Sequence, residues 1–257
     1  MLTELDVNSD MGELDTADAC AAEIEIMPLL SSVNIACGGH AGTVHTMRRT
    51  ACLAAKHAVA IGAHPGFSDG AAFGRSYRDV AVDTVTRLIV QQVTTLSTVV
   101  ASEGLSLTHV KLHGALYNQA AAQPHLARAV VDGILSLKGG LSLYALAGSV
   151  LVRAAREANI PVVEEAFADR AYRDDGSLVP RSAAGALLYG EGAVRHRVRE
   201  VLVGSVTSID DGCVSVRAGS LCIHSDTPGA IGLAQIVRSE LDAAGICVVP
   251  PFRRPGR

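Results

Sequence analysis

The segment Val110-Lys-Leu-His-Gly-Ala-Leu-Tyr-Asn118 shows how chemical groups are distributed along this chain. The apolar run from Thr108 to Leu112 predicts a short buried strand, which carries Lys111 and ends at His113 and Gly114. A cation, a titratable imidazole and a glycine therefore meet where a strand is expected to pass into a loop. A single such cluster fits a buried ion pair and a core histidine as well as it fits a functional site. The repetition of the pattern at other strand ends favours function.

Strand-like and helix-like segments alternate along the whole chain. Apolar runs predict seven strands, at 5–7, 32–36, 59–63, 108–112, 142–147, 162–166 and 221–223, and 246–249 could add another. Helical patterns occupy 21–30, 43–58, 80–103, 124–137, 149–158, 192–203 and 228–245, and a hairpin is expected at 206–217. The alternation predicts one α/β domain over residues 1–249 with a parallel sheet, followed by a loose tail over 250–257.

The polar residues that follow the predicted strands distinguish a closed barrel from an open sheet. Six of the seven strands lead into side chains with acid–base or hydrogen-bonding chemistry, namely Asn8, Asp10, Glu13, His40, His64, His113, Asp169, Arg170, His224 and Asp226. In a barrel the carboxyl ends of all strands share one rim, whereas an open sheet gathers only those near its switch point. The sequence therefore predicts a single-domain (β/α) barrel, seven-stranded and TIM-like but distorted, with one polar rim.

The nine histidines divide into two groups. Four follow strands and are candidates for function. The other five fall on helices or at the start of a strand and are assigned to structure: His45, His57, His109, His125 and His196. Asp10, His40 and His64 could together hold a divalent metal, but no H-E-x-x-H pair fixes the spacing of ligands, so the metal stays open.

Composition and missing motifs argue against several classes of function. A chain of 257 residues that is 49% apolar is typical of a globular protein, and a net charge of −4 with no Trp argues against a nucleic-acid partner. Apolar stretches stop short of the ~20 residues of a membrane span, and Glu4 and Asp6 stand where a signal peptide is basic, so a cytoplasmic protein is expected. Without a G-x-S-x-G elbow or a Walker A motif, neither a serine hydrolase nor a conventional nucleotide site is predicted.

The six cysteines are scattered without C-x-x-C spacing. Reduced and mostly buried thiols are therefore expected. Cys37 is the exception that stays open, because it lies among glycines beside His40 and could be exposed.

Seven segments resemble, in chain order, the successive motifs of the LamB/YcsF family. They are Leu5-Asp-Val-Asn-Ser-Asp-Met-Gly-Glu13, Asn34-Ile-Ala-Cys-Gly-Gly-His-Ala-Gly42, Ile61-Gly-Ala-His-Pro-Gly66, Val110 to Asn118, Phe167-Ala-Asp-Arg-Ala-Tyr172, Leu178-Val-Pro-Arg-Ser182 and Ile223-His-Ser-Asp226. The likeness covers nearly the whole chain. Four positions depart from the usual family residue: Ser9 replaces Cys, Gly39 an aromatic residue, Thr43 an acidic residue and Leu112 a Pro. Ser9 argues against a catalytic thiol at its position, and Thr43 weakens any role that needs a carboxylate there.

The resemblance implies a barrel of the glycoside hydrolase/deacetylase type. It also implies ATP-dependent, hydrolytic opening of 5-oxoproline to L-glutamate together with two partner subunits, with ATP as a co-substrate whose site the sequence does not locate. Two other interpretations stay open. One is a metal-dependent carbohydrate deacetylase or amidase that acts alone, and the other is a non-catalytic subunit that only binds the lactam.

The polar rim offers catalytic groups for ring opening. Asp10 is predicted to be the base that activates water, and His113 the acid or base toward the ring nitrogen. Lys111, His40 and His64 are expected to stabilise the carbonyl oxygen or a transferred phosphoryl group.

Other rim residues are expected to bind the substrate or to support the catalytic groups. Arg170 is the predicted partner of the substrate carboxylate, because a guanidinium can bind it through two hydrogen bonds. The remaining predicted substrate-binding residues are Asn8, Gly38, Gly39, Tyr117 and Asp169, of which the two glycines form a turn that offers backbone N–H groups. Glu13, His224 and Asp226 are expected to lie behind the catalytic and substrate-binding residues and to support them.

Overall fold

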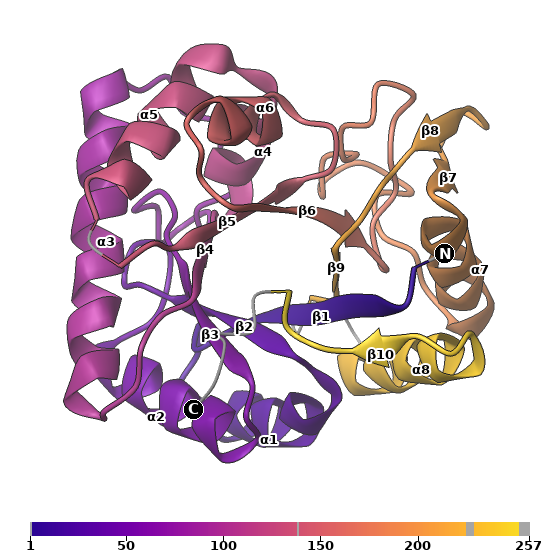
Figure 1. Cartoon of the computed structure of the whole chain (residues 1–257), viewed down its shortest axis with the longest axis horizontal. Coiled ribbons are helices and arrows are strands. Elements are labelled where there is room, and N and C mark those ends of the chain that lie inside the picture. The colour runs from indigo at the N-terminus through magenta and orange to yellow at the C-terminus, as the bar shows by residue number, and fades with distance from the viewer. Residues whose placement is uncertain (1, 138, 225–228, 252–257) are drawn as a thin grey trace.

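The computed structural model describes residues 2–137, 139–224 and 229–251, so most of the predicted tail lies outside it. In this part of the chain, seven parallel strands form a closed ring in the order β1 (Glu4–Met11), β2 (Ser32–Ala36), β3 (Ala60–His64), β4 (His109–Lys111), β5 (Ser142–Leu146), β6 (Val162–Phe167) and β9 (Ser220–Cys222). The ring closes where β9 pairs with β1, with Asp6 opposite Ser220. The predicted seven-stranded barrel is confirmed (Figure 1).

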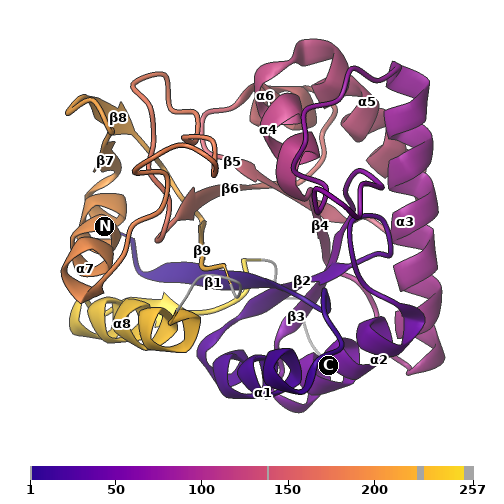
Figure 2. The ribbon, with the colours of Figure 1, turned by 180° about the vertical axis from the view of Figure 1, so that it is seen from behind.

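Helices surround the ring on its outside (Figures 1 and 2). They are α1 (Ala17–Ile26) with the 3-10 turn η1 (Met27–Leu29), α2 (Val44–Lys56), α3 (Val82–Ser102), α4 (Gly114–Ala122), α5 (Pro124–Leu135), α6 (Val150–Glu157), α7 (Glu191–Val203) and α8 (Ala230–Ala243). Most of them bury an apolar face: α2, for example, begins at a Thr43–Thr46 capping box and buries Met47, Ala51 and Ala54. None of the helices in the described residues has the length and hydropathy to cross a bilayer.

Two short additions flank the barrel. The antiparallel pair β7 (Ser205–Thr207) and β8 (Cys213–Ser215) lies where the sequence predicts a hairpin, between α7 and β9. The last strand, β10 (Cys247–Val248), pairs with the start of β1 outside the closed ring.

Three differences from the sequence-based expectation have a clear local cause or consequence. Helix α4 was not predicted; it follows β4 directly because Gly114 adopts φ +55° and the Ala115 N–H donates to the Gly74 carbonyl, so the chain turns without a capping side chain. Helix α1 begins before residue 21 because the Thr16 hydroxyl caps it. Strand β1 runs on to Met11, so Asn8 and Asp10 lie in the strand itself.

Polar side chains fill the interior of the barrel, where TIM barrels usually carry branched aliphatic residues. At one end the Asp6 carboxylate accepts hydrogen bonds from Ser31, Ser32 and Ser220. Above it, His109 donates from Nε2 to Asn34 Oδ1 across 2.9 Å. This last bond joins strands that are not neighbours, so the side chains point into the ring.

Gly62 on β3 makes room for this polar interior. A Cβ atom at this position would lie 2.1 Å from His109 Nε2. The imidazole of His109 therefore occupies the space that a side chain on β3 would take, and it bonds to Asn34 through that space.

Candidate functional site

A cavity of about 280 Å³ lies at the carboxyl ends of the barrel strands, as the distribution of polar residues predicted. Its size suits a small molecule. The ionisable side chains among its described lining residues are Asp10, Glu13, His64, Arg75, Lys111, His113, Tyr117, Arg170, Arg181 and His224. The sequence predicted all of them as site residues except Arg75 and Arg181.

Asp10 and Lys111 form the centre of the site. Lys111 Nζ lies 3.1 Å from Asp10 Oδ1, and His64 Nε2 lies 3.3 Å from Asp10 Oδ2. Asn34 donates from Nδ2 to Asp10 Oδ1 across 2.9 Å. Because a carboxylate only accepts hydrogen bonds, this contact also fixes the orientation of the Asn34 amide, whose Oδ1 faces His109.

The charges in this centre keep each other ionised. Burial alone would raise the pKa of Asp10, but the neighbouring His64 and Lys111 outweigh it and hold the pKa well below its ordinary value. Burial would lower the pKa of Lys111, but Asp10, Cys222 and Glu165 raise it well above the ordinary lysine value. The site therefore holds a fixed carboxylate and a fixed ammonium group at neutral pH.

Glu165 is a site residue that the sequence analysis missed. Its fully buried carboxylate lies 2.8 Å from Lys111 Nζ and accepts hydrogen bonds from Asn8 Nδ2 and from the Tyr117 hydroxyl, each across 2.8 Å. The signal was present in the sequence: β6 has two adjacent glutamates, and the alternation of a strand turns one of them inward.

Asn8 and Tyr117, which were both predicted to bind substrate, are held by Glu165 in different places. Asn8 does not line the cavity, because its amide lies between Glu165, Ser220, Asn34 and the Lys111 ammonium. Tyr117 does line the cavity, with its hydroxyl bonded to Glu165.

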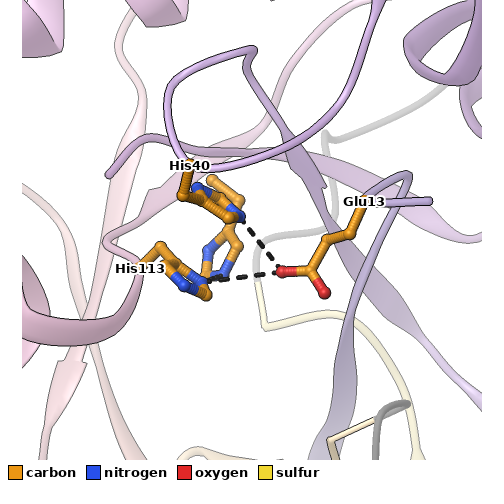
Figure 3. A group of neighbouring side chains, drawn as sticks. Glu13, His40 and His113 are labelled. Carbon is orange, nitrogen blue, oxygen red and sulfur yellow. Dashed lines mark hydrogen bonds and ion pairs between the residues drawn. The ribbon is translucent and has the colours of Figure 1, made fainter. Parts of the chain in front are cut away.

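His40, His64, His113 and Glu13 gather beside this centre. Figure 3 shows Glu13 pointing toward His40 and His113. The rings of His40 and His113 stack in parallel with centroids 3.5 Å apart. Glu13 Oε1 lies 3.1 Å from His40 Nε2 and 3.6 Å from His113 Nδ1. Burial lowers the pKa of His40 to about 3 and, together with His64 and His40, lowers the pKa of His113 far below its ordinary value, so both rings are neutral at physiological pH.

Arginines approach the cavity from connecting segments. Arg170 lines it, but its guanidinium also donates to the carbonyl oxygens of Val179 and Ala186, at 2.6 and 3.4 Å. Arg75 and Arg181 line the cavity as well, and neither was predicted. Both lie in long connections without strand or helix periodicity, so the sequence alone does not indicate which way they point.

His224 and Asp169 form a pair on another side of the cavity. His224 lines the cavity and its Nδ1 lies 3.0 Å from an oxygen of the fully buried Asp169, which does not line it. Asp169, predicted to bind substrate, therefore orients His224. Asp226 lies outside the described residues.

The glycine-rich turn after β2 does not reach the main cavity. Gly38 and Gly39 line a separate depression with Thr43. Cys37 lies there too. The sequence left open whether its thiol is exposed, but the side chain is only 3% exposed and burial raises its pKa to about 12. Ser9 is buried and does not line the cavity.

The fold and the site define a class: a seven-stranded parallel (β/α) barrel with a charged small-molecule cavity at the carboxyl ends of its strands. A sequence model described as the LamB/YcsF family matches residues 5–255. The chain belongs to the LamB/YcsF family.

Relatives and a solved structure agree with this membership. The chain is 44% identical to the A-type subunit of 5-oxoprolinase from Heliobacterium modesticaldum, over 97% of this chain and 99% of that one. It is 40% identical to the corresponding 5-oxoprolinase subunit of Pyrococcus furiosus, over 96% and 97% of the two chains. The crystal structure of a lactam utilization protein from Thermus thermophilus superposes with a TM-score of 0.87 at 41% identity, covering 96% of this chain and 99% of that one.

Proposed function

We propose that this chain binds 5-oxoproline in the cavity and, as one subunit of a larger cytoplasmic enzyme, takes part in its ATP-dependent hydrolysis to L-glutamate. The observation that carries the proposal is the contact of Asp10 with Lys111 and His64 at the base of a small cavity. The names of the relatives support the substrate class and the presence of partner subunits.

The charges around the cavity suit a small acid. Among its described lining residues, four are lysine or arginine and two are aspartate or glutamate. A guanidinium binds a carboxylate through two parallel hydrogen bonds. Two guanidinium nitrogens of Arg170 already donate to the Val179 and Ala186 carbonyls and hold the segment that carries Arg181. We therefore assign the substrate carboxylate to Arg181.

The proposed chemistry overcomes the amide resonance that protects a lactam from water. Transfer of the terminal phosphoryl group of ATP to the carbonyl oxygen makes the ring carbon electrophilic. Water then adds to this carbon, the carbon–nitrogen bond breaks, the nitrogen takes up a proton, and the ring opens to an acyl phosphate. A second water cleaves the acyl phosphate into glutamate and phosphate.

Asp10 and Lys111 have complementary roles in this scheme. Lys111 offsets the negative charge that develops on the carbonyl or phosphoryl oxygens, and Asp10 accepts the proton of the attacking water. An anionic substrate beside Lys111 would offset part of the field that lowers the pKa of Asp10, and it would thus make Asp10 a stronger base. The predicted proton transfer by His113 stays a prediction, since its ring nitrogens face His64, Glu13 and the Phe73 carbonyl.

The test is to mix the purified chain with 5-oxoproline and ATP, with and without its two partner subunits, and to follow glutamate and ADP together. We expect equal amounts of both products only when the partners are present. Glutamate formed by the chain alone, without ATP and sensitive to a chelator, would instead identify a metal-dependent amidase. Lactam binding without turnover in the complete mixture would identify a binding subunit.

A further inference from the structure

Four successive strands each deliver one ligand-type atom to the same point at the cavity wall. Glu13 follows β1, His40 follows β2, His64 ends β3 and His113 follows β4. Each offers one oxygen or nitrogen atom, and these four atoms all lie within 4.8 Å of one another. We propose that these four side chains bind one divalent first-row transition metal ion, with Zn²⁺ as the reference metal.

The hydrogen bonds behind two of the histidines fix which ring nitrogen is free to bind. His113 Nε2 lies 2.8 Å from the Phe73 carbonyl, and His64 Nδ1 lies 2.9 Å from the Lys111 carbonyl. A carbonyl oxygen only accepts, so each of these nitrogens carries the proton. Outer hydrogen bonds of this kind orient metal-binding histidines in proteins.

The consequence is that the remaining nitrogens of these two rings face each other. His64 Nε2 and His113 Nδ1 lie 3.0 Å apart, and Glu13 Oε1 lies 3.6 Å from His113 Nδ1. One cation placed among these atoms accepts an electron pair from each.

Three of the separations between donor atoms are close to those in a metal coordination sphere. Zinc–nitrogen bonds of about 2.0–2.1 Å in a tetrahedron place the donor atoms about 3.3 Å apart. Three separations, 3.0 Å between His64 and His113, 3.1 Å between His40 and Glu13, and 3.6 Å between His113 and Glu13, bracket that value. The rings of His40 and His113 lie in parallel planes, so one of them has to turn for both lone pairs to point at one ion.

The donor set also indicates the class of metal. Three imidazoles and one carboxylate suit zinc and neighbouring transition metals, whereas Mg²⁺ and Ca²⁺ prefer all-oxygen sites. The proposal differs from the Asp10, His40 and His64 set predicted from the sequence: Glu13 and His113 join, and Asp10 instead pairs with Lys111. A ligating His113 cannot transfer a proton to the ring nitrogen, so this proposal replaces that role. When bound, such a cation supplies a Lewis acid at the cavity wall.

Metal binding is tested without substrate, ATP or partners, so its outcome is independent of the proposed function. The full chain, with any affinity tag removed, is stripped with a chelator and titrated with Zn²⁺ by calorimetry and with Co²⁺ by visible absorption. We expect one ion per chain, a rise in the thermal unfolding midpoint, and cobalt bands typical of nitrogen and oxygen ligands in a site of low coordination number. No heat, no shift of the midpoint and only the spectrum of hexaaqua Co²⁺ would overturn the proposal.

Variants locate the site. Glu13→Gln and His113→Gln should weaken binding by at least about 10–100-fold, the loss that even outer partners of metal ligands cause. His196→Gln, on the exposed surface of α7, should bind like the unmodified chain. Unchanged affinity in Glu13→Gln would place the ion elsewhere and contradict the proposal. If His113→Gln does not fold, Glu13→Gln and the cobalt spectrum of the unmodified chain still decide.

Discussion

At the scale of single residues, the site depends on charges that are buried together. Lys111 is 2% exposed, and its ammonium contacts Asp10, Glu165, Asn8 and the Cys222 sulfur. A charge taken out of water needs such partners, and removing one partner leaves the other uncompensated. The same contacts that position Lys111 for chemistry therefore also determine whether the barrel interior tolerates its charge.

Replacing Lys111 tests this coupling. Lys111→Met should lower the free energy of unfolding by about 3–5 kcal/mol, because the Glu165 carboxylate remains buried without its cation. Adding Glu165→Gln should restore part of the loss, so that the double variant is more stable than the sum of the single effects by about 1–3 kcal/mol. The exposed pair Arg128–Asp132 is the control, and Arg128→Met should cost less than about 1 kcal/mol. Strict additivity in a urea-denaturation cycle would contradict the account.

His109 should make stability depend on pH. Burial, with Lys111 and His64 nearby, lowers its pKa to about 3, whereas an unfolded histidine has a pKa of about 6.5. Below about pH 6.5 His109 therefore binds a proton in the unfolded chain but not in the folded chain. The stability due to this neutral ring is complete above pH 6.5 and is lost toward pH 3, by about 1.4 kcal/mol per pH unit.

Urea denaturation between about pH 7.5 and 5.5, on either side of the unfolded histidine pKa, measures this slope. The slope for His109→Gln should be shallower than that for the unmodified chain, and the difference should approach about one proton toward pH 5.5. His125→Gln, at an exposed position of α5, should keep the original slope. Equal slopes for His109→Gln and the unmodified chain would show that His109 is not the group that resists protonation.

At the scale of elements, strand β3 needs a residue without a side chain at one position of its inner face. Gly62 faces the ring of His109, and the bond from that ring to Asn34 continues to Asp10. A larger side chain on β3 would displace the imidazole and interrupt this connection. The glycine is thus required for packing and not for an unusual backbone conformation.

Gly62→Ala should destabilise the fold by about 1–3 kcal/mol or more, because the new methyl group overlaps His109. Gly232 in α8 is a matched control, since a Cβ there meets no atom within 4 Å. Gly232→Ala should raise stability by about 0.5–1 kcal/mol through helix propensity. Denaturation midpoints measure both variants, and an unchanged midpoint for Gly62→Ala would refute the packing argument.

The elements also show what the sequence could and could not predict. Apolar runs and helical periodicity identified the ring strands because burial imposes those patterns directly. Helix α4 was missed because it begins at a positive-φ glycine without a capping side chain, so it carries no start signal. Arg75 and Arg181 were missed because tertiary contacts, and not periodicity, orient their segments. Glu165 could have been found from strand alternation.

At the scale of the whole molecule, the barrel unites groups that are far apart in the sequence. Asp10, Lys111 and Arg181 come from β1, β4 and a long connection after β6, yet all line one cavity. The prediction of a common rim rested on parallel strands that close into a ring, and the pairing of β9 with β1 provides that closure. An open sheet would have separated these groups.

The most direct test of the account is turnover by the reconstituted complex with Asp10→Asn in place of the unmodified chain. Glutamate and ADP release from 5-oxoproline and ATP should fall by at least about 100-fold, since the carboxylate is the proposed proton acceptor. Asp15→Asn, on the exposed surface, is the control and should keep full turnover. Circular dichroism and assembly with the partners should be unchanged for both variants. Near-normal turnover by a folded, assembled Asp10→Asn variant would contradict the claim that this cavity is where the ring opens.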